Sequence, residues 1–286
     1  MQVVKKGAKL ATHIVLLLGS LVMIYPFVFS FLGMFLQVEE FYGTGFLPIP
    51  TSLAYVWNNL VVFFRRAEFY SAILITLGRM LWYGVVIGFT SVLGGYVFAK
   101  INFAGKKFAW MFLMSSMMVP GVALLIPQYL MFAKMGLNGN LIILFITGCF
   151  SAYNIFLLQQ SFTSLGEEYR EAAEIDGANF FYIVFCVYMP MVKPVLAVIM
   201  IQLFIGQWND YLFPSIFLNN RPEYWPIGVV SVKIQSDYLL GAAGGGLYNY
   251  PIVLATAIIM MIPPVVVYIV FQKYFVSGLT MGGVKD

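Results

Sequence analysis

Charged side chains are scarce in this sequence. Only 10% of its 286 residues are Asp, Glu, Lys or Arg, whereas 61% are hydrophobic and the mean hydropathy is +0.88. An average soluble domain carries about 25% charged residues. The composition therefore excludes an ordinary soluble domain and predicts a membrane protein.

Cysteine and histidine are equally rare. The two cysteines, Cys149 and Cys186, belong to no Cys-x-x-Cys pair and have no partner histidine, so neither a disulfide nor a metal site is predicted. The only histidine, His13, has no ionisable partner nearby in the sequence, which disfavours a proton relay within the membrane.

Sequence patterns for catalysis are also missing. The chain has no Gly-x-x-x-x-Gly-Lys-Ser/Thr phosphate loop, no His-Glu-x-x-His and no plausible serine triad, so no catalytic residue is predicted and ATP is not expected to bind here. The one basic loop is too short to indicate nucleic-acid binding. The chain is therefore not expected to be an enzyme.

Long hydrophobic runs dominate what is present. A bilayer core of roughly 30 Å needs about 20 apolar residues per helix, and six stretches meet that need. We expect them to form six transmembrane helices of an all-α protein with a single transmembrane domain over 1–286. The predicted spans are residues 12–36, 70–99, 108–132, 141–162, 195–218 and 250–275.

The distribution of basic residues predicts the orientation. With six spans both termini lie on one side, and the segments on that side hold ten Lys and Arg residues against five in the opposite loops. Basic residues favour the cytoplasmic side. Both termini and the acidic segment 163–190 are therefore placed in the cytoplasm, and the glycine-rich stretch 241–246 is expected to be an external loop.

The segment 163–190 is predicted to form a helix-turn-helix. Ser164 and Glu167 have the spacing of a capping box, which places a helix start near Leu165. Gly177 can take the left-handed conformation that ends such a helix, and a second helix then runs toward Pro190.

Two interpretations of this segment compete. The acidic residues could belong to a solvated loop, but a docking surface explains both the acids and the small apolar side chains between them. Ala172, Ala173, Ile175 and Ala178 would then enter a cleft of a partner protein.

Polar residues inside the spans indicate a substrate pathway, because such residues usually face a cavity or a neighbouring helix. Gln202, Gly206 and Asn209 recur at i, i+4 and i+7 and so share one helical face. Packing between helices is the competing explanation for each residue. The predicted pathway residues are Gln128, Tyr129, Asn154, Gln202, Gly206, Trp208, Asn209 and Asp210.

The motif Glu171-Ala172-Ala173, followed by Gly177 and then Pro190, resembles the coupling motif of permease subunits in binding-protein-dependent ATP-binding-cassette importers. Val187 and Met189 replace the Ile and Leu usual in that family, which keeps the positions apolar. The resemblance implies that an ATPase contacts Glu168, Glu171, Ala172, Ala173, Asp176, Gly177 and Ala178.

Three further stretches resemble the carbohydrate branch of these permeases, in particular its shorter maltose-type subunit. They are residues 175–178, 207–211 with Pro214 beyond, and 272–285. The resemblance implies a saccharide substrate and a bacterial or archaeal cytoplasmic membrane. It also implies three partners, namely a second, non-identical permease, two cytoplasmic ATPase domains that bind ATP and Mg, and an extracytoplasmic sugar-binding protein.

Other functions stay open from the residues. An ion-coupled secondary transporter would carry intramembrane acids or an inverted repeat, and Asp210 alone gives little support for it. A permease of the same family for a non-sugar solute is a further alternative, whereas no residue set favours an intramembrane enzyme or a scaffold.

Overall fold

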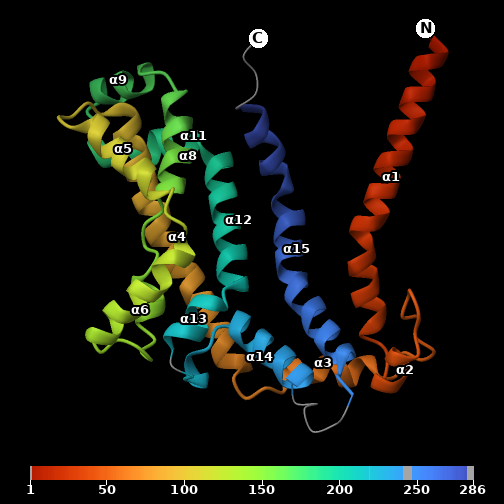
Figure 1. Ribbon diagram of the computed structural model, residues 1–286. Coiled ribbons are helices and arrows are strands. Elements are labelled where there is room, and N and C mark those ends of the chain that lie inside the picture. Colours follow the sequence, from red (N-terminus) through yellow and green to blue (C-terminus); the bar gives the residue numbers. More distant parts are fainter. Residues whose placement is uncertain (1, 219, 241–246, 282–286) are drawn as a thin grey trace. The chain divides into compact units, whose positions relative to one another are not determined.

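The computed structural model describes residues 2–218, 220–240 and 247–281, and within these ranges the chain is helical with no strand. Three helices are long and apolar enough to cross a membrane. These are α1 (Gln2–Gly33) over Thr12–Gly33, α4 (Phe69–Lys100), and α15 (Tyr250–Met281) over Tyr250–Gln272 (Figure 1). They coincide with the first, second and sixth predicted spans. The predicted loop 241–246 and the last residues of the 272–285 motif lie outside the described residues.

The predicted third span is not one straight helix. It consists of α5 (Lys106–Ser116), the 3-10 turn η1 (Gly121–Leu124) and α6 (Leu125–Lys134), with a bend of 89° at the break. Pro120 lies in this break, whereas Pro127 is the third residue of α6, where its missing N–H costs no helical hydrogen bond.

The predicted fourth and fifth spans are also interrupted. The fourth is divided into α7 (Ile143–Ile146) and α8 (Ala152–Thr163), with Gly148 between them at φ +76°. The fifth is divided into α12 (Lys193–Asn209) and α13 (Leu212–Phe217).

The number of spans follows from these breaks. By length and composition, three helices of the described residues can cross a membrane. Two pairs of bent helices also qualify if each pair counts as one span, which gives up to five spans. The first pair is the one bent by 89°, and the second is 180–191 with 193–209, bent by 85°. The six-span count therefore stays a prediction, as does the single permease domain over 1–286.

The chain divides into two compact units. The first comprises Met1–Phe69 with Ser231–Ile262. It contains α1, α2 (Val38–Tyr42), α3 (Val56–Phe64), most of α14 (Ile227–Leu240) and the start of α15. Asn59 of α3 donates to the carbonyls of Met34 (2.9 Å) and Leu36 (3.0 Å), so one amide satisfies carbonyl groups that follow the end of α1.

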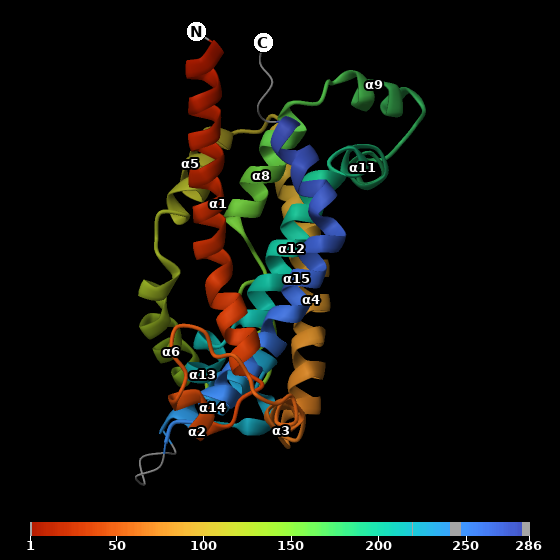
Figure 2. The same ribbon diagram turned by 90° about the vertical axis from the view of Figure 1, so that its right-hand side faces the viewer.

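The second unit, Tyr70–Val230 with Pro263–Asp286, is built around α4. Its remaining elements are α9 (Glu168–Ile175), α10 (Phe180–Tyr182), the π-helical segment η2 (Ile183–Tyr188), α11 (Met189–Met191) and η3 (Pro222–Tyr224). Its core joins α4, α8, α9 and η2 through buried residues that include Tyr96, Phe162, Ala173 and Tyr188. Within this unit, α9 lies at one end near α8 and α11, and α6 and α13 lie at the other (Figures 1 and 2).

Candidate functional site

The acidic helix α9 begins later than the sequence predicts. Because α8 continues to Thr163, Ser164 ends that helix, and its hydroxyl donates to the Ser161 carbonyl (2.8 Å). Glu167 precedes the first residue of α9, and its side chain makes no capping hydrogen bond. The predicted capping box is therefore wrong, since both of its side chains have other partners.

The end of α9 agrees with the sequence. Gly177 has φ +79°, and its N–H donates to the Glu174 carbonyl (3.0 Å), while the Ala178 N–H donates to the Ala173 carbonyl (2.9 Å). This pair of bonds is the Schellman motif. A Cβ at position 177 would have no atom within 4 Å, so glycine is required by the backbone conformation and not by lack of space.

A second helical stretch follows the turn, as predicted. The Asn179 side chain accepts from the Tyr182 N–H (2.9 Å), which caps α10, and helix then continues through η2 and α11 past Pro190. A π-helical segment is rare and often occurs at functional sites.

Two side chains anchor the connection between α8 and α9. The side chain of Lys100, at the end of α4, is only 4% exposed. Its ammonium lies 3.0 Å from Glu167 Oε1 and also donates to the Leu165 carbonyl. The Tyr188 hydroxyl of η2 donates to the Gly166 carbonyl (2.9 Å). Together they hold three of the four residues from Ser164 to Glu167, namely Leu165, Gly166 and Glu167.

An ion-pair network continues along α9. Arg170 contacts Glu167 (2.9 Å) and Glu174 (3.0 Å). The hydrogen bond from Lys100, and after it that from Arg170, lowers the pKa of Glu167 below its ordinary value, and the bond to Glu167 raises the pKa of Arg170. Glu167 is therefore an ionised carboxylate between two cations.

The predicted coupling residues do not all face outward. Ala172 and Ile175 are exposed, the latter by 86%, but Ala173 is only 9% exposed and packs in the core of its own chain. Ala173 is thus unavailable to a partner in this structure, which corrects its expected role as a contact. The other exposed members of the set are Glu168, Glu171, Asp176 and Gly177, and Ala178 is half-buried.

Sequence reasoning missed Lys100, Arg170 and Tyr188. The signal available for Lys100 was its place at the end of a long predicted span, on the same predicted side of the membrane as the acidic segment 163–190. The partner of that lysine depends on a contact between positions 67 residues apart, which no local pattern encodes.

The predicted polar face on α12 is present. Gln202, Gly206 and Asn209 are all exposed and share their face with Ile205, to whose carbonyl the Asn209 amide donates (3.0 Å). Trp208 differs, because it is 7% exposed and stacks on Phe204 with ring centres 6.1 Å apart. Its ring therefore packs within the chain, although the sequence places Trp208 among the predicted pathway residues.

Asp210 forms a buried ion pair. Its carboxylate lies 2.6 Å from Arg79 Nη2 of α4, and the two side chains are 22% and 3% exposed. Gly228 packs against the same position, since a Cβ there would lie 2.6 Å from the Asp210 carbonyl oxygen. Asp210 is therefore the counterion of Arg79 at the break between α12 and α13.

The remaining predicted pathway residues occupy separate elements. Gln128 and Tyr129 lie on α6, where the Tyr129 ring packs edge-on against Phe217 of α13 (5.8 Å), and Asn154 lies in the first turn of α8. All three are half-buried. No hydrogen bond among the described residues joins Gln128, Asn154 and Gln202.

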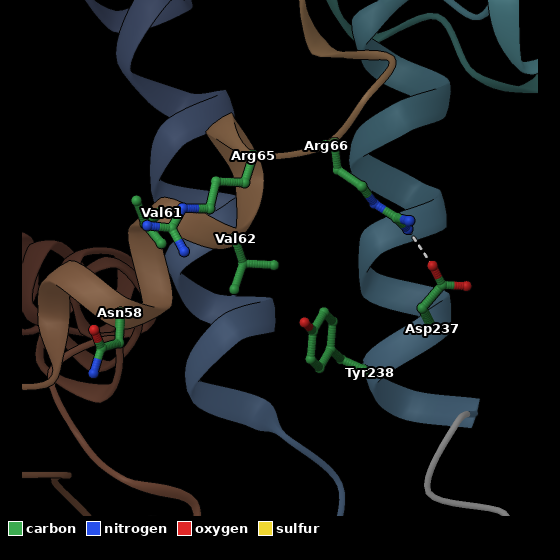
Figure 3. A pocket seen from close by; sticks show the side chains of 7 residues that line it. All are labelled: Asn58, Val61, Val62, Arg65, Arg66, Asp237 and Tyr238. Atoms are coloured by element: carbon green, nitrogen blue, oxygen red, sulfur yellow. Dashed lines mark hydrogen bonds and ion pairs between the residues drawn. The ribbon is translucent and has the colours of Figure 1, made fainter.

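The first unit contains a cavity of about 500 Å³ that no predicted pathway residue lines (Figure 3). An ion pair between Arg66, which precedes α4, and Asp237 of α14 closes one side of it. The lining residues are Asn58, Val61, Val62, Arg65, Arg66, Asp237 and Tyr238.

Comparison with known proteins identifies the family. The model of the binding-protein-dependent transport system inner membrane component matches residues 91–281. The chain belongs to this family. It is thus a multi-pass inner membrane component of a transport system, and members of this family are transport subunits and not enzymes.

Among its relatives is the arabinooligosaccharides transport system permease protein AraQ of Halalkalibacterium halodurans, which is 27% identical over 93% of this chain and 92% of that protein. The sn-glycerol-3-phosphate permease UgpE of Pectobacterium atrosepticum is 26% identical over 96% and 97%. The melibiose/raffinose/stachyose permease MelC of Bacillus subtilis is 31% identical over 70% and 73%.

A solved structure has the same fold. This inner membrane component superposes on a chain of a bacterial ABC transporter that imports the acidic polysaccharide alginate, with a TM-score of 0.81. The two chains are 26% identical, and the match covers 94% of this chain and 97% of that one.

Proposed function

We propose that this chain is a permease subunit of an ATP-driven saccharide importer and that segment 163–190 is its docking site for a cytoplasmic ATPase. The substrate class is supported by relatives named for arabinooligosaccharides and for melibiose, raffinose and stachyose, and by the alginate importer. All of these names denote saccharides of more than one sugar unit, and we propose an oligosaccharide as the substrate.

The shape of α9 carries the docking proposal. The connection that leads into the helix is anchored to α4 and η2 through Lys100 and Tyr188. Within the helix, Ala173 packs in the core, whereas Ala172 and Ile175 are exposed. An exposed isoleucine beside a small alanine suits a cleft on a partner, because burying an apolar side chain in such a cleft stabilises the complex.

Transport also requires partners in this proposal. A second, non-identical permease completes the pathway, two cytoplasmic ATPase domains bind ATP with Mg and hydrolyse it, and an extracytoplasmic binding protein delivers the saccharide. The family description names the dependence on a binding protein. Within the span Thr12–Gly33 of α1, an 18-residue window has no residue buried against the rest of the chain, so this surface is available to lipid or to the second permease.

The pathway is proposed to follow the exposed polar face of α12. Gln202 and Asn209 offer amide donors and acceptors of the kind that sugar hydroxyls need, and Gly206 keeps the surface between them open. Gln128, Tyr129 and Asn154 complete the proposed set from α6 and α8.

An ion-coupled mechanism is not favoured. Asp210 is the only acidic residue within the predicted spans, and it is already paired with Arg79. The family to which the chain belongs consists of components of binding-protein-dependent transport systems. A non-sugar solute is the alternative that a relative supports directly, since UgpE is named for sn-glycerol-3-phosphate.

The test is ATP hydrolysis by the purified complex of this chain with its second permease, ATPase and binding protein. Arabinose oligosaccharides, raffinose, alginate oligosaccharides and sn-glycerol-3-phosphate are compared as stimulants. We expect at least one saccharide to stimulate hydrolysis and import. Stimulation by sn-glycerol-3-phosphate alone would contradict the saccharide assignment.

The same complex tests the docking segment. Gly177→Val forbids the left-handed turn and Glu171→Lys reverses charge on α9, so both are expected to lower stimulated hydrolysis and import while insertion into the membrane is kept. Gly45→Val and Glu39→Lys are the matched controls in a loop and a helix distant from α9 in the sequence. Normal import by both α9 variants would remove the segment from the coupling mechanism.

A further inference from the structure

Lys100 is an unusual lysine because its side chain is only 4% exposed. A buried charge costs free energy unless it is paired and hydrogen-bonded. Three groups compensate it here, namely the Glu167 carboxylate at 3.0 Å, the Leu165 carbonyl and the Tyr188 ring, whose centre lies 5.6 Å away. All three belong to the α8–α9 connection or to η2.

The surroundings of Lys100 are rigid. Tyr188 is 0% exposed and packs edge-on against Tyr96 of α4 (5.1 Å) and Phe162 of α8 (6.2 Å). The same tyrosine hydroxyl holds the Gly166 carbonyl. A displacement of α9 therefore disturbs contacts with α4 through the anchored α8–α9 connection.

The sequence of α4 adds a second observation. Its 32 residues contain two charged side chains, Arg79 and Lys100, and each forms an ion pair with a different part of the proposed machinery. Arg79 holds Asp210 at the end of the polar face of α12, and Lys100 holds Glu167 at the start of α9. These charges lie 21 residues apart, roughly 30 Å along a helix at 1.5 Å per residue.

We propose that Lys100 is a positioning residue through which α4 couples the docking helix α9 to the α12 face. This inference rests on the proposed docking of an ATPase at segment 163–190. In this proposal α4 moves as one rigid helix, and its two ion pairs connect it to Glu167 before α9 and to Asp210 after α12. When α9 moves with the ATPase, the Lys100–Glu167 pair transmits that movement to α4, and the Arg79–Asp210 pair transmits it to the break between α12 and α13.

The experiment uses the complete complex in proteoliposomes, with ATP hydrolysis measured with and without saccharide-loaded binding protein, and with import measured in parallel. Lys100→Met removes the charge and keeps the stem of the side chain. We expect it to lower stimulated hydrolysis and import on the order of tenfold. The amount of assembled complex and the KM for ATP are expected to stay unchanged, which a general loss of folding would not produce.

Three further variants sharpen the result. Lys107→Met removes an exposed lysine at the start of α5 and is expected to behave like the unchanged protein. Lys100→Arg keeps the charge and is expected to restore most of the stimulation. The double variant Lys100→Met with Glu167→Gln is expected to be no worse than Lys100→Met alone, because contacting residues that act as one pair are not additive.

Normal stimulation and import in Lys100→Met overturn the inference. If Lys100→Met fails to assemble, Glu167→Gln decides, since the Glu167 side chain is 46% exposed and tolerates substitution; normal coupling in that variant overturns the inference as well. Gly177→Val separates the two claims. If it uncouples while the Lys100 and Glu167 variants do not, only the positioning role fails, and if it also imports normally, the docking proposal fails.

Discussion

Glu167 connects the electrostatics of α9 to pH. Its pKa is lowered in the folded protein, chiefly by the hydrogen bond from Lys100 and then by Arg170. A carboxylate with a lowered folded pKa contributes stability that is present above its unfolded pKa and is lost as pH falls through the folded pKa.

We therefore predict a pH-dependent difference between the unchanged protein and Glu167→Gln. The unchanged protein should have the higher Tm near neutral pH, and this difference should disappear as the pH falls below the folded pKa of Glu167. Thermal unfolding in detergent across acidic and neutral pH measures it. A difference that grows toward acid would contradict the assigned ion pair.

The Arg79–Asp210 pair gives a second prediction. Asp210→Asn leaves the Arg79 charge buried without a counterion, which costs about 3–5 kcal/mol of stability when a buried pair is broken from one side. Denaturation of the purified protein measures the loss. The matched control is Asp237→Asn, which removes the partner of Arg66 in a pair whose side chains are 32% and 56% exposed and is expected to cost about 0–1 kcal/mol.

Replacing both charges with Arg79→Met and Asp210→Asn should recover part of the stability, because no uncompensated charge remains. Equal losses for Asp210→Asn and Asp237→Asn would show that the Arg79 pair is not buried as the structure has it.

Individual residues also show where sequence reasoning succeeds and fails. Gly177 was predictable because a left-handed turn has a strong local preference for glycine. The role of Ser164 was not predictable, because the same Ser-x-x-Glu spacing can occur where a helix ends. Only the length of α8 decides whether Ser164 begins or ends a helix. Trp208 was misplaced because helical spacing reveals which residues share a face but not which face is buried.

At the level of helices, substitutions on the exposed face of α12 test whether this face lines the proposed substrate pathway. We predict that Gln202→Leu and Asn209→Leu each reduce import several-fold by removing hydrogen-bonding groups, with the double variant lowest and complex assembly retained. Ile205→Leu changes shape on the same face without removing a polar group and should have little effect. Normal uptake kinetics in the double variant would assign this face to helix packing.

The three unbroken spans could be predicted because hydropathy alone identifies a long apolar helix. The broken ones could not be delimited, because the apolar composition continues through a bend. The helices are interrupted at Pro120 and at the left-handed Gly148, but the sequence around both positions stays apolar. The polar groups freed at such breaks must be satisfied within the protein, which depends on tertiary contacts.

For the whole molecule, the excess of basic residues on one side predicts cytoplasmic termini. The test is labelling of single cysteines with an impermeant reagent in intact cells, with Cys149 and Cys186 replaced by serine. Gly43→Cys should be labelled from outside, whereas Lys107→Cys should be labelled only after permeabilisation. Labelling of Lys107→Cys in sealed cells would reverse the orientation.

The same basic side carries α9, so the orientation and the docking proposal depend on each other. An ATPase is cytoplasmic in the proposed assembly, and α9 can reach it only if segment 163–190 is cytoplasmic too. The assembly is expected to contain one copy of this chain per two ATPase domains, with a different permease as its neighbour. A functional homodimer with the ATPase alone would remove the second permease but leave the docking proposal intact.

The most direct measurement is a crosslink between α9 and the ATPase in the assembled complex. Ile175→Cys, in a background with both native cysteines replaced by serine, places a thiol on the most exposed apolar position of the helix. We predict crosslinking to the ATPase that Gly177→Val abolishes, and none from the control Ile49→Cys on an exposed loop of the first unit. Import by a complex in which Ile175→Cys never crosslinks to the ATPase, under reagents that span the gap, would contradict docking at α9.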